Sequence, residues 1–529
     1  MSINMRLQYI VVIAFMGTLL SACDDFLKES PKDEFSVDQY FSDPDHAISA
    51  VNGLYRTGAP QMFDGGVYSG TRMMFIQYMT GFFDNEYRGQ ELHIQRAQQL
   101  TLDGSNTATY MNDIWLDLYR GISRANNSIA NIPATPGLST EEANSLLGEA
   151  RFFRALAYFY LVRMFGDVPL VTEPVTSLDG VYVERSGIES VYGLIVEDLT
   201  FALEQGGLST DHMADNGSRI TQGAVAILLA DVYLTMAGYP LQQTERYADA
   251  ATIARNLING EYGDYELEIN GPDAANSAYN KIRKSDVSRE YLYYKEYMAG
   301  ISNSPNPPWS YPVGQVKYTQ YDITNGAYQP EPEFLWAYDP AVDLRMQNKQ
   351  FFHWTLDTPD GEVTFQPTPY MWHDDAALFN GPAASSKDVV VYGFANAYLI
   401  AAEALAHTEG VTPEAAGYLA EVRGRAYWQI GVDAIQTEVA GLPVEDFIEE
   451  VWTERMRELV FEFRTWFDIQ RTRKYPVTDE NNRGQVTYVD VVGHTNPLGA
   501  TFQEKHLLFP LSENEVQRNP GLGGNNPGY

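Results

Sequence analysis

Apolar residues recur at helical spacing along most of this sequence, and that pattern constrains the fold more than any other feature. Residues 36–165 contain several such stretches, each with its apolar side chains on one face. The helix predicted over 149–165 ends where Gly166 and Pro169 follow, because neither residue favours continuing a helix. We therefore expect a mostly α-helical fold with little strand.

Two segments each predict a pair of neighbouring helices joined by a short turn. In the first, Thr221 begins a helix and residues 238–240 (GYP) separate it from a second. Residues 394–426 repeat this arrangement, with alanines where the two helices would cross. Such pairs are typical of tetratricopeptide-like units, although their spacing here is irregular. The sequence thus predicts an irregular tetratricopeptide-like helical scaffold over 36–260 and 391–529.

The segment between these helical blocks has a different composition. Residues 262–372 contain 13 of the 35 tyrosines, 4 of the 8 tryptophans and 11 of the 27 prolines. The stretch 304–312 (SPNPPWSYP) excludes a helix, because proline lacks the amide hydrogen and restricts the residue before it. We interpret 262–390 as a loop-rich aromatic insertion that binds ligand, since long ordered loops on a rigid scaffold often carry function.

Cys23 is the only cysteine, which excludes a disulfide framework and a thiolate metal site. It follows an apolar run over 9–20, and that run has the length of a signal-peptide core and is too short to span a membrane. The residues LSAC at 20–23 resemble a lipobox. We expect residues 1–22 to be a signal peptide and Cys23 to carry lipid such as palmitate, leaving residues 23–529 as the mature chain.

The net charge of −34, from 36 basic and 70 acidic residues, excludes two classes of partner. Nucleic-acid binding relies on lysine and arginine that neutralise phosphates, so we expect no nucleic-acid ligand. Docking on anionic lipid headgroups also requires the opposite charge. Beyond residue 23 no apolar run is long enough to span a membrane.

Several ordered motifs across the chain resemble one known family. The most typical are EARFFRA at 149–155 with GDVPL at 166–170, ER…EL…FE…RTWFD…R over 454–471, and FPL…NP…NPGY over 509–529. Further matches are CDDFL at 23–27, YF at 40–41, GLY at 53–55, WLDLY at 115–119 and AN at 125–126, whereas VYGFA at 391–395 departs from the pattern. Together they resemble the SusD/RagB family of Bacteroidetes surface lipoproteins.

The resemblance implies a function and a location. Members of the family capture nutrients at the cell surface and deliver them to a SusC-type TonB-dependent outer membrane transporter. It therefore implies a surface-exposed protein in the outer membrane, held by a lipid anchor, that binds its ligand without catalysis or cofactor. The aromatic insertion favours an oligosaccharide or polysaccharide as that ligand. The family does not fix ligand residues by motif.

Aromatic rings and polar side chains are the expected ligand contacts, because sugar rings stack on the former and hydrogen-bond to the latter. The first group of candidates lies between two early helices and comprises Asp84, Asn85, Tyr87 and Arg88. The second group lies in the insertion and comprises Trp309, Tyr311, Trp336, Tyr338, Trp354 and Trp372. We expect two or three of the aromatic residues in the insertion to contact ligand.

One helix predicted over 448–471 places four carboxylates in a stripe: Glu450, Glu454, Glu458 and Glu462. Two of them could form the acid–base pair of a glycosidase. We favour a structural ion network instead, because arginines are interleaved and would offset the like charges. No histidine spacing typical of a metal site is present, so we expect neither a catalytic residue nor a metal.

Three alternatives to glycan capture stay open at this stage. The same family includes members that take peptides, and an acidic surface would favour basic ones. A helical glycoside hydrolase is a second alternative, from a different class. A purely structural surface protein is the third.

Overall fold

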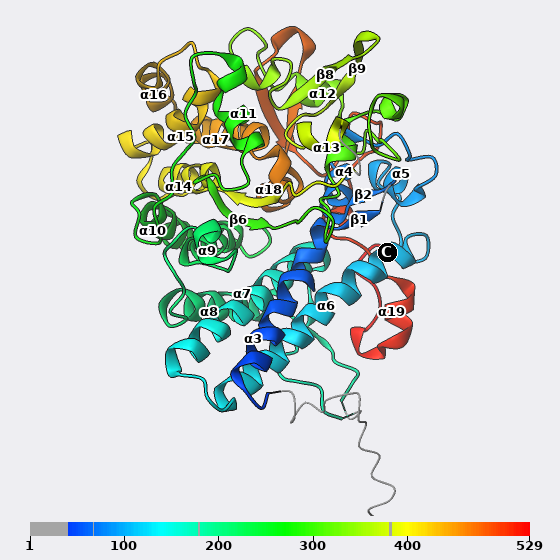
Figure 1. Ribbon diagram of the computed structural model, residues 1–529, viewed down its shortest axis with the longest axis vertical. Helices are drawn as coiled ribbons and strands as arrows, with labels where there is room; N and C mark the ends of the chain where they lie inside the picture. Colours follow the sequence, from blue (N-terminus) through cyan, green and yellow to red (C-terminus); the bar gives the residue numbers. More distant parts are fainter. Residues whose placement is uncertain (1–40, 67, 178–179, 380–382) are drawn as a thin grey trace, which may run out of the picture.

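The computed structural model describes residues 41–66, 68–177, 180–379 and 383–529. The predicted signal peptide and Cys23 lie outside this part of the chain. Figure 1 shows a helical body with the insertion and most of the strands in its upper half. The mostly α-helical, tetratricopeptide-like scaffold predicted from the sequence is confirmed. No helix among the described residues is both long and apolar enough to cross a membrane.

The lower half of the molecule in Figure 1 contains the short helix α19 (Glu513–Arg518) and a group of N-terminal helices. The N-terminal helices are α3 (Pro44–Asn52), α6 (Ala108–Asn131), α7 (Thr140–Phe165) and α8 (Ile188–Glu204). Helix α7 packs against both α6 and α8. It begins with a capping box between Ser139 and Glu142, and it ends at Gly166, whose φ of +71° suits glycine. The predicted stop of this helix is therefore confirmed.

Further helix pairs continue the scaffold toward the insertion. They are α9 (Gln222–Ala237) with α10 (Arg246–Ile258), and α14 (Phe394–Glu409) with α15 (Pro413–Ala426), followed by α16 (Val432–Ala440) and α17 (Val444–Glu458). Thr221 caps α9 by accepting a hydrogen bond from the amide of Ala224. Helices α9, α10 and α14 pack on one another, so both predicted pairs join one continuous hydrophobic core.

Short helices and strands connect and cover these pairs. The short helices are α4 (Arg72–Tyr78), α5 (Leu92–Gln98), α11 (Ala278–Lys284), α12 (Pro332–Leu335), α13 (Asp375–Phe379), α18 (Thr465–Thr472) and α19 (Glu513–Arg518). The strands are β1 (Gly65–Gly66), β2 (Gly70–Thr71), β3 (Phe83–Asp84), β4 (Val168–Pro169), β5 (Arg185–Ser186), β6 (Tyr291–Lys295), β7 (Gln329–Pro330), β8 (Phe352–Thr358), β9 (Gly361–Pro369), β10 (Val389–Gly393), β11 (Lys474–Thr478) and β12 (Val486–Asp490).

The described strands form six separate two-stranded antiparallel sheets rather than one large sheet. Within the insertion, β8 and β9 form a hairpin that stands at the top of Figure 1. Strands β6 and β10 pair and thereby join the start of the insertion to its end. Strands β3 and β7 pair across a long stretch of sequence and attach the middle of the insertion to the early loop at 84–91.

The predicted helix over 448–471 is wrong in its middle. Helix α17 ends at Glu458, a 3₁₀ turn covers Val460–Glu462, and Phe463 has a φ of +59° before α18 begins. The buried side chain of Gln77 spans this break. Its amide donates to the carbonyl of Phe463 at 2.7 Å and its oxygen accepts from the amide of Trp466 at 3.1 Å. A partner on another element thus stabilises the interruption.

Candidate ligand-binding site

The loop at 84–91 lies directly against the insertion. Strand β3 pairs with β7, and the Glu86 carboxylate accepts hydrogen bonds from the amides of Val313 at 2.9 Å and Gly326 at 2.7 Å. Such charge-assisted bonds to backbone amides hold a loop in one conformation. The structure therefore brings together the two regions in which the sequence predicted ligand contacts.

Two tyrosines mark this junction, the exposed Tyr68 and the half-buried Tyr87. The rings of Tyr68 and Tyr87 meet edge to face with centroids 4.7 Å apart, and 38% of Tyr68 is exposed. The Tyr68 carbonyl accepts from the side-chain amides of Asn85 at 3.0 Å and Asn325 at 2.9 Å. Because both asparagines are buried, Asn85 positions Tyr68 rather than facing a ligand.

Charged groups surround the two tyrosines. Asp84 and Arg88 form an ion pair at 2.6 Å, and the Arg88 side chain is the more exposed partner. Glu331 follows β7; burial raises its pKa to about 7, and the negative charge of Asp84 adds to the rise. We call Tyr68, Asp84, Tyr87, Arg88 and Glu331 the tyrosine surface.

Most of the aromatic candidates in the insertion fill the protein interior. Trp309, Tyr338 and Trp372 pack in the main core, and Tyr311 belongs to a smaller buried cluster. Their rings offer no open face on which a sugar could stack. The structure leaves Trp336 and Trp354 half-buried, so these two are the members of that set with accessible ring surface.

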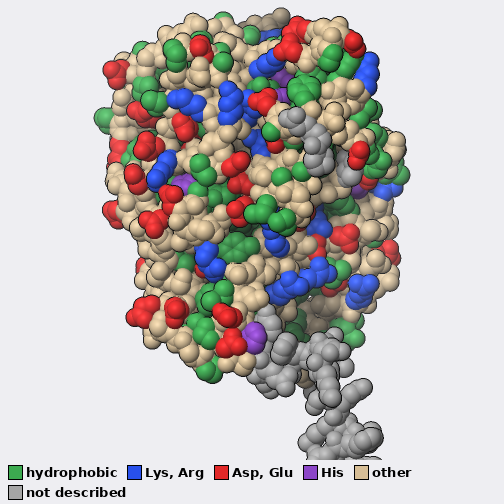
Figure 2. All heavy atoms as spheres, in the orientation of Figure 1, with side chains coloured by type: hydrophobic (Ala, Val, Ile, Leu, Met, Phe, Trp, Pro, Cys, Tyr) green, Lys and Arg blue, Asp and Glu red, His purple; other side chains and the backbone are tan. Residues whose placement is uncertain are grey.

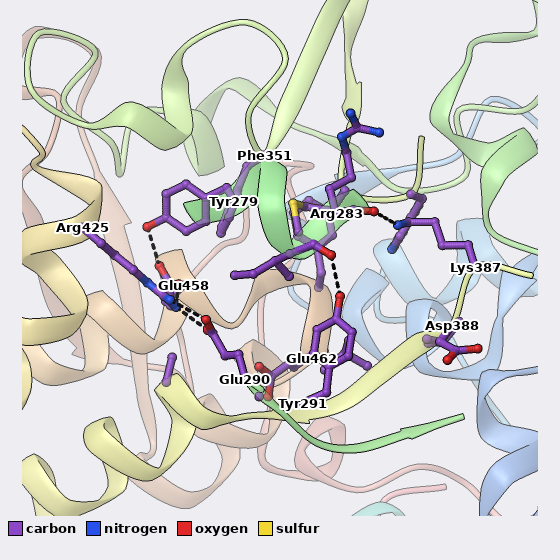
Figure 3. A pocket seen from close by; sticks show the side chains of 18 residues that line it. Tyr279, Arg283, Glu290, Tyr291, Phe351, Lys387, Asp388, Arg425, Glu458 and Glu462 are labelled. Carbon is purple, nitrogen blue, oxygen red and sulfur yellow. Dashed lines mark hydrogen bonds and ion pairs between the residues drawn. The ribbon is translucent and has the colours of Figure 1, made fainter. Parts of the chain in front are cut away.

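A small cavity lies between the insertion and the scaffold (Figure 3). Strands β6 and β10, helix α11 and the end of α17 contribute its walls, which include Trp372 and Phe351. Its volume is about 90 Å³. Ligand pockets usually measure about 300–1,000 Å³, so this cavity has room for a few water molecules and is too small for an oligosaccharide.

Arginines and carboxylates beside this cavity form a buried ion network. Arg345 donates to Glu454 and Glu458 at 2.7 Å each and also pairs with Asp343. Arg425 binds Glu458 at 2.6 Å and holds Glu290 through two hydrogen bonds, as Figure 3 shows. The structural interpretation of the glutamate stripe is confirmed for Glu454 and Glu458.

The network also determines what these carboxylates can do. Burial alone would raise the pKa of Glu454, but the charges of Arg345 and Arg423 lower it to about 2. A glycosidase needs a carboxylic acid that is protonated near neutral pH. Glu454 is ionised and engaged by arginines, so it does not fit that role.

Glu462 is the exception in the stripe. Burial raises its pKa to about 8, since its nearest cation, the Nε of Arg464, lies 3.9 Å away. Its Oε2 has no hydrogen-bond partner among the described residues. The break after α17 explains the difference, because it moves Glu462 out of line with Glu454 and Glu458. Among the described residues, no group of three or more His, Cys, Asp or Glu side chains is placed to hold a metal ion.

The structure contains a larger pocket that the sequence did not predict. It has a volume of about 770 Å³ and lies among the ends of α7 and α9, helix α18, and residues 503–508 and 526–528. We call it the large pocket. Three motifs that carried the family resemblance, those at 166–170, 454–471 and 509–529, contribute residues to its wall. The sequence shows these motifs but not their convergence in space, so it did not indicate the pocket.

A scaffold of irregular helix pairs that carries a loop-rich insertion defines a tetratricopeptide-like helical class of protein. Comparison with known proteins narrows this class. A model described as the SusD family matches residues 342–529, and one described as "Starch-binding associating with outer membrane" matches residues 61–234. The chain belongs to the SusD family.

Relatives and solved structures agree with this assignment. SusD-like protein P25 of Formosa agariphila is 24% identical over 505 residues, which cover 88% of this chain and 90% of the relative. A SusD-like protein of Bacteroides ovatus is 27% identical over 491 residues, covering 88% and 82%. The crystal structure of a SusD superfamily protein from Parabacteroides distasonis has a TM-score of 0.79 and 27% identity, covering 94% of this chain and 100% of the other.

Proposed function

We propose that the protein binds nutrient oligosaccharides or polysaccharides at the outer cell surface and delivers them to a SusC-type TonB-dependent transporter. A lipid on Cys23 holds it in the outer membrane. The observation that carries the proposal is the tyrosine surface, where one exposed and one half-buried tyrosine ring meet charged groups at the junction of a scaffold loop and the insertion.

The chemistry of this surface suits a sugar. The apolar faces of a sugar ring stack on aromatic rings, and this surface offers the exposed ring of Tyr68 beside the half-buried ring of Tyr87. Arg88 donates hydrogen bonds and Asp84 accepts them, so hydroxyls of either orientation find a partner. Because the pKa of Glu331 is about 7, its carboxyl group can either donate or accept near neutral pH.

Two solved structures with the same fold support the ligand class. One is named as a laminarin binding SusD-like protein, with 20% identity and a TM-score of 0.66, covering 92% of this chain and all of the other. The other is surface glycan-binding protein A from Bacteroides uniformis, with 17% identity and a TM-score of 0.68. A lipid tether beside a transporter raises the ligand's effective concentration at the pore without chemistry.

The first experiment is native affinity electrophoresis of the form lacking residues 1–23 through a panel of neutral and acidic polysaccharides. One glycan should retard the protein, and Tyr68→Ala and Tyr87→Ala should each weaken retardation about tenfold, equivalent to about 1.4 kcal/mol. Tyr182→Ala is the matched control, because this tyrosine is 62% exposed and lies outside the tyrosine surface. Equal retardation of all three variants would exclude the tyrosine surface as the site.

Transport partnership and anchoring need a separate test in cells. A Cys23→Ala variant should leave the membrane fraction, because lipid chains supply the anchoring free energy. Wild-type protein should co-purify with a β-barrel transporter from detergent-solubilised outer membranes. Recovery of the wild type without any barrel would contradict the delivery step.

The acidity of the chain favours one second candidate, a basic peptide ligand. The net charge is −34, and Figure 2 shows acidic side chains spread over the visible face with fewer basic ones among them. If no polysaccharide retards the protein, basic peptides should bind and Tyr87→Ala should weaken them. Release of sugar products from a glycan on long incubation would instead indicate a hydrolase.

A further inference from the structure

The large pocket has the dimensions and the lining of a binding site that the tyrosine surface does not explain. Its volume of about 770 Å³ falls within the range of about 300–1,000 Å³ found for ligand pockets. Part of its wall is apolar. The apolar wall consists of Val162, Ile188, Tyr192, Tyr239, Pro240, Phe467, Leu507, Leu508 and Pro527.

The lining of this pocket has a net positive charge, whereas the whole protein has a net negative charge. Five basic and two acidic side chains line it, in a chain whose net charge is −34. The basic residues are Arg163, Arg185, Arg471, Arg473 and Lys505, and the acidic residues are Asp167 and Glu504. A basic pocket in an acidic protein indicates an anionic ligand, because the surrounding charge would otherwise favour cations.

Two of the five basic residues are already neutralised. Arg473 holds Glu504 through two hydrogen bonds, and Arg471 binds both Glu403 and Asp468. The other three have no carboxylate within 4 Å among the described residues. Arg185 donates to the side chain of Asn526 and to two backbone carbonyls, and Lys505 lies 5.0 Å from the centre of the Tyr529 ring.

Arg163 is the most buried of these three, at 7% exposed. Its guanidinium lies between the rings of Phe159 and Phe467, 3.6 Å and 3.8 Å from their centres. Its Nε donates to the Phe159 carbonyl at 3.0 Å, whereas its Nη2 has no hydrogen-bond partner among the described residues. Because both faces are covered, only the edge that carries the two Nη atoms can bind a ligand.

A carboxylate matches this edge. Guanidinium and carboxylate groups form two parallel hydrogen bonds in one plane, and such bonds are stronger where water is excluded. Burial lowers the pKa of Arg163, and the nearest acid, Asp231, is engaged by Arg464 and Tyr392. The Oε1 of Gln470, which also lines the pocket, has no partner either and can accept a hydrogen bond from a hydroxyl.

We propose that the large pocket binds a carboxylate-bearing sugar of the hexuronic acid class. The carboxylate binds the Arg163 edge, Lys505 adds a second positive charge, and the exposed ring of Tyr239 provides a platform for a sugar ring. Tyr239 is 42% exposed and lines the same pocket. No residue of the tyrosine surface lines this pocket, and the proposal stands or falls independently of the proposed function.

Calorimetry on the mature chain tests the proposal. The probes are glucuronate, galacturonate and trigalacturonate, with the methyl ester of galacturonate and a neutral galactose trisaccharide as uncharged controls and inorganic phosphate as a second anion. We expect at least one uronate to bind and its uncharged counterpart to bind about 10–100-fold more weakly, since a charge-assisted hydrogen bond is lost. The affinity should also fall as salt is added.

Variants locate the binding. Arg163→Gln should reduce uronate affinity about 10–100-fold and Lys505→Gln about threefold, whereas Lys281→Gln, a lysine outside the pocket, should change nothing. Arg163→Lys keeps the charge but lacks the two-pronged edge, so it should restore only part of the affinity. Thermal unfolding of each variant confirms folding, and Lys505→Gln tests the pocket even if Arg163→Gln fails to fold.

Three outcomes would overturn the proposal. They are the absence of uronate binding to the wild type at millimolar concentration, uronate binding that survives both Arg163→Gln and Lys505→Gln, and binding of phosphate without binding of uronate. Loss of uronate binding in Tyr68→Ala or Tyr87→Ala would place the ligand on the tyrosine surface and would equally contradict this site. Uronate binding that is retained in Tyr68→Ala and Tyr87→Ala supports the large pocket as a second, independent site.

Discussion

Two buried polar regions of this molecule differ in whether their arginines are paired with carboxylates. Beside the small cavity, Arg345 and Arg425 each bind two or more carboxylates, and each of these carboxylates is paired with at least one arginine. In the large pocket, Arg163 lies between two phenylalanine rings with no carboxylate in reach. The first arrangement joins the insertion to the scaffold. The second leaves a buried positive charge available, which is what a ligand site requires and a purely structural site does not.

The largest expected effect concerns Arg345. Arg345→Ala should lower the free energy of unfolding by about 3–5 kcal/mol, because it leaves three buried carboxylates without their shared cation. Denaturant unfolding measures the loss. The control is Arg255→Ala, which removes a half-exposed pair with Glu414 and should cost no more than about 1 kcal/mol. Equal losses would show that the network beside the small cavity adds no special stability.

Acid should weaken the same network. The folded pKa of Glu454 is about 2, below its ordinary value of 4.5, so its contribution is fully present above pH 4.5 and is lost as the pH falls toward 2. At about 1.4 kcal/mol per pH unit, the loss amounts to about 3 kcal/mol. Unfolding measured from pH 5 to pH 2 should show this slope, and Glu454→Gln should flatten it. A slope unchanged by Glu454→Gln would contradict the assignment.

Glu462 should respond to pH in the opposite direction. Its folded pKa of about 8 lies above the ordinary value of 4.5, so the fold is favoured below pH 4.5 and loses stability as the pH rises to 8. Glu462→Gln should therefore raise the melting temperature at pH 8 and leave it nearly unchanged at pH 4.5, with a gain of about 3 kcal/mol at pH 7. Glu438→Gln, at an exposed position, should show no such dependence.

The smallest effect is expected at Arg163. Arg163→Met should change the free energy of unfolding by no more than about 1 kcal/mol, because no ion pair is broken and methionine fits between aromatic rings. A loss comparable to that of Arg345→Ala would mean that Arg163 is structural, and the contrast between the two regions would disappear. Differential scanning calorimetry of both variants in one buffer decides the comparison.

The sequence predicted the helical scaffold well because helical periodicity is a local property. The end of α7 at Gly166 and the start of α9 at Thr221 follow from residues that act on their neighbours, whereas α7 begins at Thr140, nine residues before the predicted helix. The break after α17 could not be predicted in this way. It depends on Gln77, which lies 386 residues away in sequence from Phe463 and reaches it only in the folded chain.

The candidate site was predicted less completely, for a related reason. Composition shows that the insertion is aromatic, but exposure depends on the packing of elements that are distant in sequence. Trp309 and Tyr338 became core, whereas Tyr68, which had no distinctive sequence context, became exposed beside Tyr87. The large pocket draws its wall from segments between 162 and 528, so no local pattern could reveal it.

The six separate two-stranded sheets have a consequence for how such a protein diversifies. Each described pair is a short two-stranded sheet with its own hydrogen bonds, and none is extended by a third strand. A substitution or insertion in one of these sheets therefore alters one stretch of surface and leaves the strand register of the other sheets intact. Ligand preference can drift in small steps at the periphery while the helical frame is inherited unchanged.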